Sequence, residues 1–148
     1  MTATPEGARD SAVPRELIDA YLATDYRVGS RADAFILRIG EHSPALAARY
    51  RQCGEQSAAF ISACNPYSER QIEAVNAAAH ARLCVELECR GMLFIEGAGV
   101  APAGKWQEQS VLVLGVCLDT AKDIGRRFQQ NAIVWTGADA VPQLCLLR

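Results

Sequence analysis

The sequence predicts an α/β (α+β) fold, in which helices pack on a mixed, mostly antiparallel sheet with a ferredoxin-like β-α-β-β-α-β core. Three observations predict this class. The chain has 148 residues, which is enough for one domain with one hydrophobic core. Its residues are 50% hydrophobic and 22% charged, as in ordinary soluble proteins. From residue 58 onward, apolar runs alternate between the periods of strands and helices.

An N-terminal hairpin and helix are expected to extend this sheet. Residues 1–12 are small and polar, so we expect a disordered N-terminus followed by one domain over residues 13–148. Apolar side chains at helical spacing predict a helix over residues 14–24. Strand-like runs at residues 26–28 and 34–39 flank a short polar loop, which predicts a hairpin.

Capping residues predict where the next helix begins and ends. The Ser43 hydroxyl is suited to an N-cap, and Pro44 is suited to the first turn. Gly54 is a natural C-terminal stop. The apolar run that follows, residues 58–63, predicts a buried strand.

A long helix is predicted over residues 68–90. Its start has the pattern of a capping box, in which Ser68 caps the first turn and Gln71 reaches back. Tyr67 and Ile72 stand at the two positions of a hydrophobic staple. A glycine follows the last predicted helical residue, as is common at helix ends.

Strands at residues 92–96 and 111–116 are expected on either side of a long loop, residues 97–110. A tight hairpin needs only about two to five residues between its strands. The predicted loop is much longer and holds three glycines, a tryptophan and a glutamate. Long ordered loops on a rigid scaffold are usually functional, so this loop marks the expected position of a site. The remaining predicted elements are a helix capped by Asp119 and strands at residues 132–135 and 143–147.

The composition excludes several classes of function. The net charge is −2, and no run of Lys and Arg is longer than Arg126-Arg127, so no nucleic-acid partner is expected. No apolar run approaches the ~20 residues that span a bilayer, so no membrane association is expected. The N-terminus lacks the apolar core of a secretory signal, which places the expected location in the cytoplasm.

The cysteines and histidines predict neither disulfides nor a metal site. None of the six cysteines forms a C-x-x-C pair and most lie in apolar segments, so we expect reduced thiols. His42 and His80 have no ligand-like partner at metal spacing. Cys64 and His80 are also too far apart along the predicted helix to act as nucleophile and base. The sequence identifies no cofactor.

Polar residues around the predicted helix form the first candidate group. Asn65, Tyr67 and Ser68 occupy the turn from a buried strand into the helix, where backbone amides bind anions. The same residue types are also ordinary turn and cap chemistry. Asn76 falls near the centre of the predicted buried helix face, so either a ligand or a core carbonyl must satisfy its amide.

The second candidate group lies at the predicted loop and near the C-terminus. If Glu96 ends one strand and Glu108 begins its neighbour, their carboxylates flank the neck of the loop and could serve as acid and base. Alternatively both point into water. Trp106 offers a stacking face or a loop anchor, and Lys105 could neutralise either acid. The further candidate ligand-binding residues are Ser110, Gln130 and Asn131.

These motifs together resemble a small bacterial family of uncharacterised proteins, domain of unknown function 3293. The resemblance rests on Ser62-Ala63-Cys64-Asn65-Pro66, Asn76, Trp106-Gln107-Glu108-Gln109-Ser110 and Gln130-Asn131-Ala132, in that order. It implies that these polar positions belong together, and it implies no reaction.

Three hypotheses about function remain open. The first is a small polar or anionic ligand in a pocket formed by the 64–68 turn, the helix 68–90 and the 97–110 loop. The second is a hydrolase-like or metal-assisted enzyme that uses Glu108 and Glu96. The third is a structural or interaction protein whose polar set is an internal hydrogen-bond network, with homodimerisation through the C-terminal strand.

Overall fold

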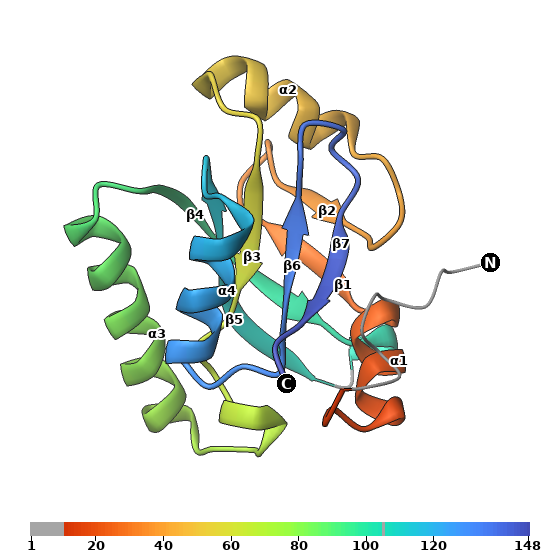
Figure 1. Cartoon of the computed structure of the whole chain (residues 1–148), viewed down its shortest axis with the longest axis vertical. Coiled ribbons are helices and arrows are strands. Elements are labelled where there is room, and N and C mark those ends of the chain that lie inside the picture. The colour runs from red at the N-terminus through yellow and green to blue at the C-terminus, as the bar shows by residue number, and fades with distance from the viewer. Residues whose placement is uncertain (1–10, 105) are drawn as a thin grey trace.

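The structure is a computed structural model that describes residues 11–104 and 106–148 (Figure 1). The described residues form four α-helices, two short 3₁₀ turns and seven strands. The helices are α1 Arg15–Ala23, α2 Pro44–Cys53, α3 Glu73–Cys89 and α4 Leu118–Arg127. The strands are β1 Asp25–Val28, β2 Phe35–Leu37, β3 Ala58–Ile61, β4 Leu93–Val100, β5 Gln107–Leu114, β6 Ala132–Thr136 and β7 Gln143–Leu146.

The seven strands form one sheet in the order β2-β1-β4-β5-β3-β6-β7. The predicted α/β class is confirmed at this level. The expected mixed sheet is not found in the described residues, because every neighbouring pair of strands runs antiparallel. Among the same residues, no helix is long and apolar enough to cross a membrane.

The first part of the chain forms the predicted elements for the predicted reasons. The strands β1 and β2 pair as an antiparallel hairpin. The Ser43 hydroxyl accepts a hydrogen bond from the backbone N–H of Leu46, at 3.1 Å, and so caps α2. Gly54 ends this helix in the left-handed conformation, with φ of 72°.

Most of the predicted disordered N-terminus, residues 1–10, lies outside the described residues. Ser11 is described: its hydroxyl accepts a hydrogen bond from the N–H of Val13, at 3.1 Å. The same hydroxyl donates to the carbonyl of Arg148. Lys105, which could neutralise either Glu96 or Glu108, also lies outside the described residues.

The predicted start of the long helix is wrong. α3 begins at Glu73, and Ile72, which precedes it, is 70% exposed rather than part of a staple. Tyr67 and Ser68 have φ of 54° and 63°, so the chain at Ser68 is left-handed and cannot enter a helix there. The Ser68 hydroxyl is used elsewhere, because it accepts a hydrogen bond from the amide of Asn131. The capping box is therefore a sequence pattern without the corresponding structure.

The predicted 97–110 loop is also wrong, because most of it is sheet. β4 and β5 pair without interruption from Leu93↔Leu114 to Val100↔Gln107, which leaves residues 101–106 as the connection. Gly97 and Gly99, taken from the sequence as loop glycines, lie inside β4. A Cβ atom at Gly97 would overlap the carbonyl oxygen of Arg27 on β1. This glycine therefore permits close approach of two strands rather than a turn.

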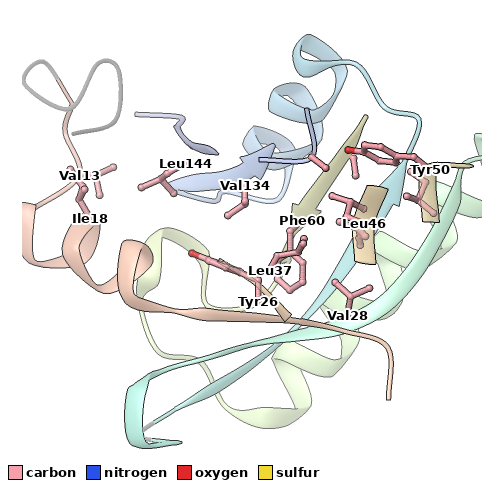
Figure 2. Packing of buried hydrophobic residues seen from close by; sticks show 14 residues of the cluster. Val13, Ile18, Tyr26, Val28, Leu37, Leu46, Tyr50, Phe60, Val134 and Leu144 are labelled. Carbon is pink, nitrogen blue, oxygen red and sulfur yellow. The ribbon is translucent and has the colours of Figure 1, made fainter. Parts of the chain in front are cut away.

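The sheet separates two hydrophobic clusters, and β5 contributes to both by simple alternation. Leu112 and Leu114 pack in the cluster that includes residues of α1 and α2, whereas Val111 and Val113 pack with α3 and α4. Figure 2 shows the first cluster. In this cluster the rings of Tyr26 and Phe60 pack edge to face, with 5.1 Å between their centroids. The two faces of β5 therefore belong to different layers of the molecule.

We predict that Gly97→Ala lowers the free energy of unfolding by about 2–3 kcal/mol, because the added methyl group forces β1 and β4 apart. Gly99→Ala is the matched control on the same strand, since its Cβ would meet only ordinary van der Waals contacts at 3.6 Å or more. Chemical denaturation of the two variants measures the difference. Equal stabilities would contradict the role assigned to Gly97.

Candidate functional site

A cleft of about 710 Å³ lies where α1, the turn after β3, the start of α3 and the beginning of β5 meet. These segments come from distant parts of the sequence, and each contributes polar side chains to the cleft. The residues that line the cleft include Tyr21, Asn65, Ser68, Arg70, Gln71, Glu73, Asn76, Trp106 and Glu108. Four of the predicted site residues, Asn65, Asn76, Trp106 and Glu108, are therefore brought to one place.

Asn65 and Asn76 are joined by a reciprocal pair of hydrogen bonds. The backbone N–H of Asn65 donates to Oδ1 of Asn76 at 2.9 Å, and Nδ2 of Asn76 donates to Oδ1 of Asn65 at 2.9 Å. Oδ1 of Asn65 also accepts from the N–H of Gln71, at 2.9 Å. Asn65 has φ of 46°, a conformation that asparagine tolerates better than most residues. The two amides thus hold the turn after β3 against the first turn of α3.

Glu108 is the half-buried acid of the cleft. Its Oε2 accepts a hydrogen bond from Nδ2 of Asn65 at 3.2 Å. Burial raises the pKa of the Glu108 carboxyl, although hydrogen bonds from Ser62 and Asn65 act in the opposite direction. The carboxyl therefore binds a proton more readily than an exposed glutamate, and it faces a space that a ligand can enter.

A smaller cavity of about 70 Å³ shares four lining residues with the cleft: Tyr21, Ser68, Trp106 and Glu108. It brings in the predicted residues Ser110, Gln130 and Asn131. These three side chains already have partners in the protein. Nε2 of Gln130 donates to the carbonyl of Cys64 at 3.0 Å, and the Ser110 hydroxyl donates to the carbonyl of Glu108 at 3.2 Å.

Asn131 links α1 to the turn after β3. Its Nδ2 donates to the hydroxyls of Tyr21 and Ser68, each at 3.2 Å, and its Oδ1 accepts from Arg148 at 3.1 Å. The Tyr21 and Ser68 hydroxyls also contact each other. Asn131 is almost fully buried. Its position in this network favours a structural role beside the cleft.

The family model for "Protein of unknown function (DUF3293)" matches residues 61–133 of the chain. Over this range the chain belongs to the DUF3293 family. No curated protein and no solved structure matches the chain. The DUF3293 range contains Asn65, Asn76, Trp106 and Glu108, whereas Tyr21, which also lines the cleft, lies outside it.

Two predicted site residues line neither the cleft nor the smaller cavity. The ring of Tyr67 lies under the guanidinium of Arg148, 4.2 Å from ring centroid to Cζ, and lines neither cavity. Glu96 pairs with Val111 in the sheet, and Glu108 pairs with Gly99. Since side chains alternate along a strand, Glu96 and Glu108 lie on opposite faces, and the expected carboxylate pair does not form.

The expectation that His80 has no ligand-like partner is also wrong. Its Nε2 lies 2.7 Å from Oε1 of Glu96 and 3.6 Å from Sγ of Cys84. The expectation for Cys64 agrees with the structure: its thiol is buried, donates to the carbonyl of Gln109 at 3.6 Å, and has a pKa raised by burial. A raised pKa keeps the thiol protonated, which does not suit a nucleophile.

The sequence analysis missed Tyr21, Ser62 and Arg70 as lining residues. Tyr21 lies at the helical spacing of the apolar residues of α1, but a tyrosine hydroxyl on such a face needs a polar neighbour, and that requirement is the signal that could have identified it. Asn76 was expected at the centre of a buried face, but it is only half-buried and stands at the cleft. The buried face of α3 is formed instead by Ala79, His80, Leu83 and Leu87.

We predict that Asn76→Ala lowers the free energy of unfolding by about 1–3 kcal/mol, because the backbone N–H of Asn65 loses its acceptor. Arg70→Ala is the control, since Arg70 lines the same cleft but is exposed. Thermal and chemical unfolding of both variants measures the difference. A fully stable Asn76→Ala variant would show that the amide pair does not hold the turn.

We predict that the free energy of unfolding of Glu108→Gln increases relative to that of the wild type as the pH rises. The folded-state pKa of Glu108 lies above the ordinary value of 4.5, so the folded wild type binds more protons than the unfolded chain between those two pKa values. Its stability therefore falls as pH rises through this window, while the glutamine does not titrate. Denaturation midpoints of both proteins, measured from about pH 4 to about pH 8, test this. A constant difference across that range would contradict the prediction.

Proposed function

We propose that the protein binds a small, planar, polar ligand in the cleft between α1, the turn after β3, the start of α3 and β5. The observation that carries the proposal is the pair formed by Trp106 and Glu108, which line both the cleft and the smaller cavity next to it. An aromatic face and a nearby acceptor are the elements that small-molecule sites use for stacking and orientation.

The charges of the cleft favour a ligand that donates hydrogen bonds. Glu108 is an acceptor when ionised, and it is less exposed than the other charged side chains, Arg70 and Glu73, that line the cleft. Trp106 is 41% exposed, so part of its indole ring is accessible to a ligand. A nitrogen heterocycle with ring or exocyclic N–H groups, such as a nucleobase, satisfies both features. Arg70 is suitably charged to meet an anionic substituent on such a ligand.

The raised pKa of Glu108 supports the same ligand class. A buried carboxyl without a cationic partner favours its protonated form, and an N–H donor from a ligand would favour the ionised form instead. Binding of a donor ligand would then release a proton. Its affinity would rise with pH until Glu108 is fully ionised in the free protein.

The structural hypothesis remains the second candidate, because several of the polar residues already satisfy one another. Asn65, Asn76 and Asn131 each have their side-chain amides bonded within the protein. β7 ends the sheet and offers one edge to a second copy, as the homodimer hypothesis requires. A monomer at high concentration in light scattering would contradict the dimer. The enzyme hypothesis loses its basis, since its two carboxylates lie on opposite faces.

Two further inferences accompany this function. We infer a ferredoxin-like core from β3 to β6 with α3 and α4, and the strand order β4-β5-β3-β6 supports it. We also infer a bacterial, cytoplasmic protein; the free cysteines, of which Cys89 and Cys117 are exposed, suit a reducing compartment.

The binding proposal is tested by tryptophan fluorescence in the Trp135→Phe background, which leaves Trp106 as the reporter. Adenine, guanine, cytosine and their nucleosides are the probes. At least one is expected to quench Trp106 fluorescence, and Glu108→Gln is expected to weaken that binding about tenfold, or about 1.4 kcal/mol.

Trp135 serves as the matched control, because its Nε1 donates to the carbonyl of Val116 in the other hydrophobic layer. In the Trp106→Phe variant the fluorescence of Trp135 should not respond to the probes. Absence of quenching by every probe at about 1 mM would contradict the proposed ligand class. Quenching that is unchanged by Glu108→Gln would contradict the role of the carboxyl.

A further inference from the structure

A second group of chemically active side chains lies on the other face of the sheet, away from the cleft. His80 and Cys84 stand four residues apart on α3, and Glu96 is on β4. Residues at this spacing on a helix share one face, and here that face packs on the strand that carries Glu96. Nε2 of His80, Sγ of Cys84 and a carboxylate oxygen of Glu96 all lie within 4.8 Å of one another.

The distances between the three candidate ligand atoms can be compared with those between the ligands of a tetrahedral metal ion. With bond lengths of about 2.3 Å for Zn–S and about 2.0–2.1 Å for Zn–N, a tetrahedral angle separates sulfur from nitrogen by about 3.5 Å. The observed separation of Cys84 Sγ from His80 Nε2 is 3.6 Å. The contact of His80 Nε2 with Glu96 Oε1, at 2.7 Å, is a hydrogen bond that a metal would replace with a wider spacing. The Glu96 side chain is 67% exposed and so is free to make that adjustment.

The environment of His80 is consistent with a ligand rather than a packing residue. Its side chain is among the buried polar groups, and its Nδ1 has no hydrogen-bond partner in the described part of the chain. All of its polar contacts therefore run through Nε2 toward Cys84 and Glu96. A metal at Nε2 would leave Nδ1 as it is, so the support for a ligand role comes from the orientation of Nε2 toward the other two groups. Coordination through Nε2 gives a reason for the residue and its orientation.

The charges around the cluster favour a cation. Burial is the main cause that raises the pKa of the Cys84 thiol, and the negative charges of Glu96 and Glu88 raise it further. A divalent ion would reverse this effect and stabilise the thiolate, with release of the thiol proton to solvent. A His, Cys and carboxylate set is typical of borderline metals such as zinc and is a poor match for calcium or magnesium.

We propose that His80 Nε2, Cys84 Sγ and the carboxylate of Glu96 bind a divalent transition metal ion, with zinc as the best match and solvent as the fourth ligand. Glu96 is exposed, so the fourth position opens to solvent. The site is independent of the proposed ligand cleft, since Glu96 and Glu108 lie on opposite faces of the sheet. Either proposal can fail without affecting the other.

Cobalt(II) titration of the full-length, reduced protein tests the site, because cobalt bound to a thiolate shows a charge-transfer absorption in the near ultraviolet that zinc removes by competition. The wild type is expected to show this band at one equivalent of cobalt. Cys84→Ser is expected to abolish it, and Cys89→Ser, at an exposed cysteine of the same helix, is expected to retain it.

A second pair of variants keeps the test valid if Cys84→Ser or His80→Gln fails to fold. Glu96→Gln replaces an exposed side chain and is expected to weaken cobalt affinity at least about tenfold. Glu88→Gln, a neighbouring acid outside the cluster, is expected to leave the affinity within about twofold. The absence of a band in the wild type, or equal losses in Cys84→Ser and Cys89→Ser, would overturn the proposal.

Discussion

The uninterrupted register between β4 and β5 is the constraint on which the rest of the structure depends. Eight consecutive residue pairs, from Leu93↔Leu114 to Val100↔Gln107, fix which face each side chain occupies. A shift of one residue would exchange the two hydrophobic layers and would move every polar group of the hairpin to the opposite side. The register therefore determines that Glu108 faces the cleft and that Glu96 faces α3.

The reciprocal bonds between Asn65 and Asn76 are the second requirement of the cleft. They connect the turn after β3 to α3, which begins eight residues after Asn65, across a segment with left-handed residues at Tyr67 and Ser68. The turn has backbone hydrogen bonds of its own, from Ser68 N–H to the Asn65 carbonyl and from Glu69 N–H to the Pro66 carbonyl, and the side-chain amides add the link to α3. The wall of the cleft is thus held by the same polar groups that first indicated a site in the sequence. This explains why binding and structural roles are hard to separate for these residues.

Local rules predicted the elements that local interactions stabilise. The hairpin of β1 and β2 and the cap at Ser43 depend on neighbours within a few residues, and both were predicted correctly. The start of α3 and the length of β4 were not, because each depends on a distant contact. Ser68 is bonded to Asn131, and Gly97 is required by the backbone of Arg27. No window of sequence around either residue contains that information.

The same distinction applies to the sites. The convergence of Asn65, Asn76, Trp106 and Glu108 was predicted, since each looked out of place in its own segment. The contact of His80 with Glu96 was missed because it depends on how α3 lies against β4. The spacing of His80 and Cys84 was visible in the sequence, but two residues alone do not indicate a metal site. Only the third group, supplied by the sheet, completes the pattern.

Gly97 also limits how chains with this fold can diverge. The position is a strand interior, where most proteins accept many side chains, yet here the Arg27 carbonyl occupies the space of a Cβ atom. An exposed cleft residue such as Arg70 can be replaced without moving a strand, whereas a side chain at this glycine displaces the neighbouring strand. In an alignment of related sequences, a glycine retained at this point would therefore report the close strand crossing even where every polar residue of the cleft had changed.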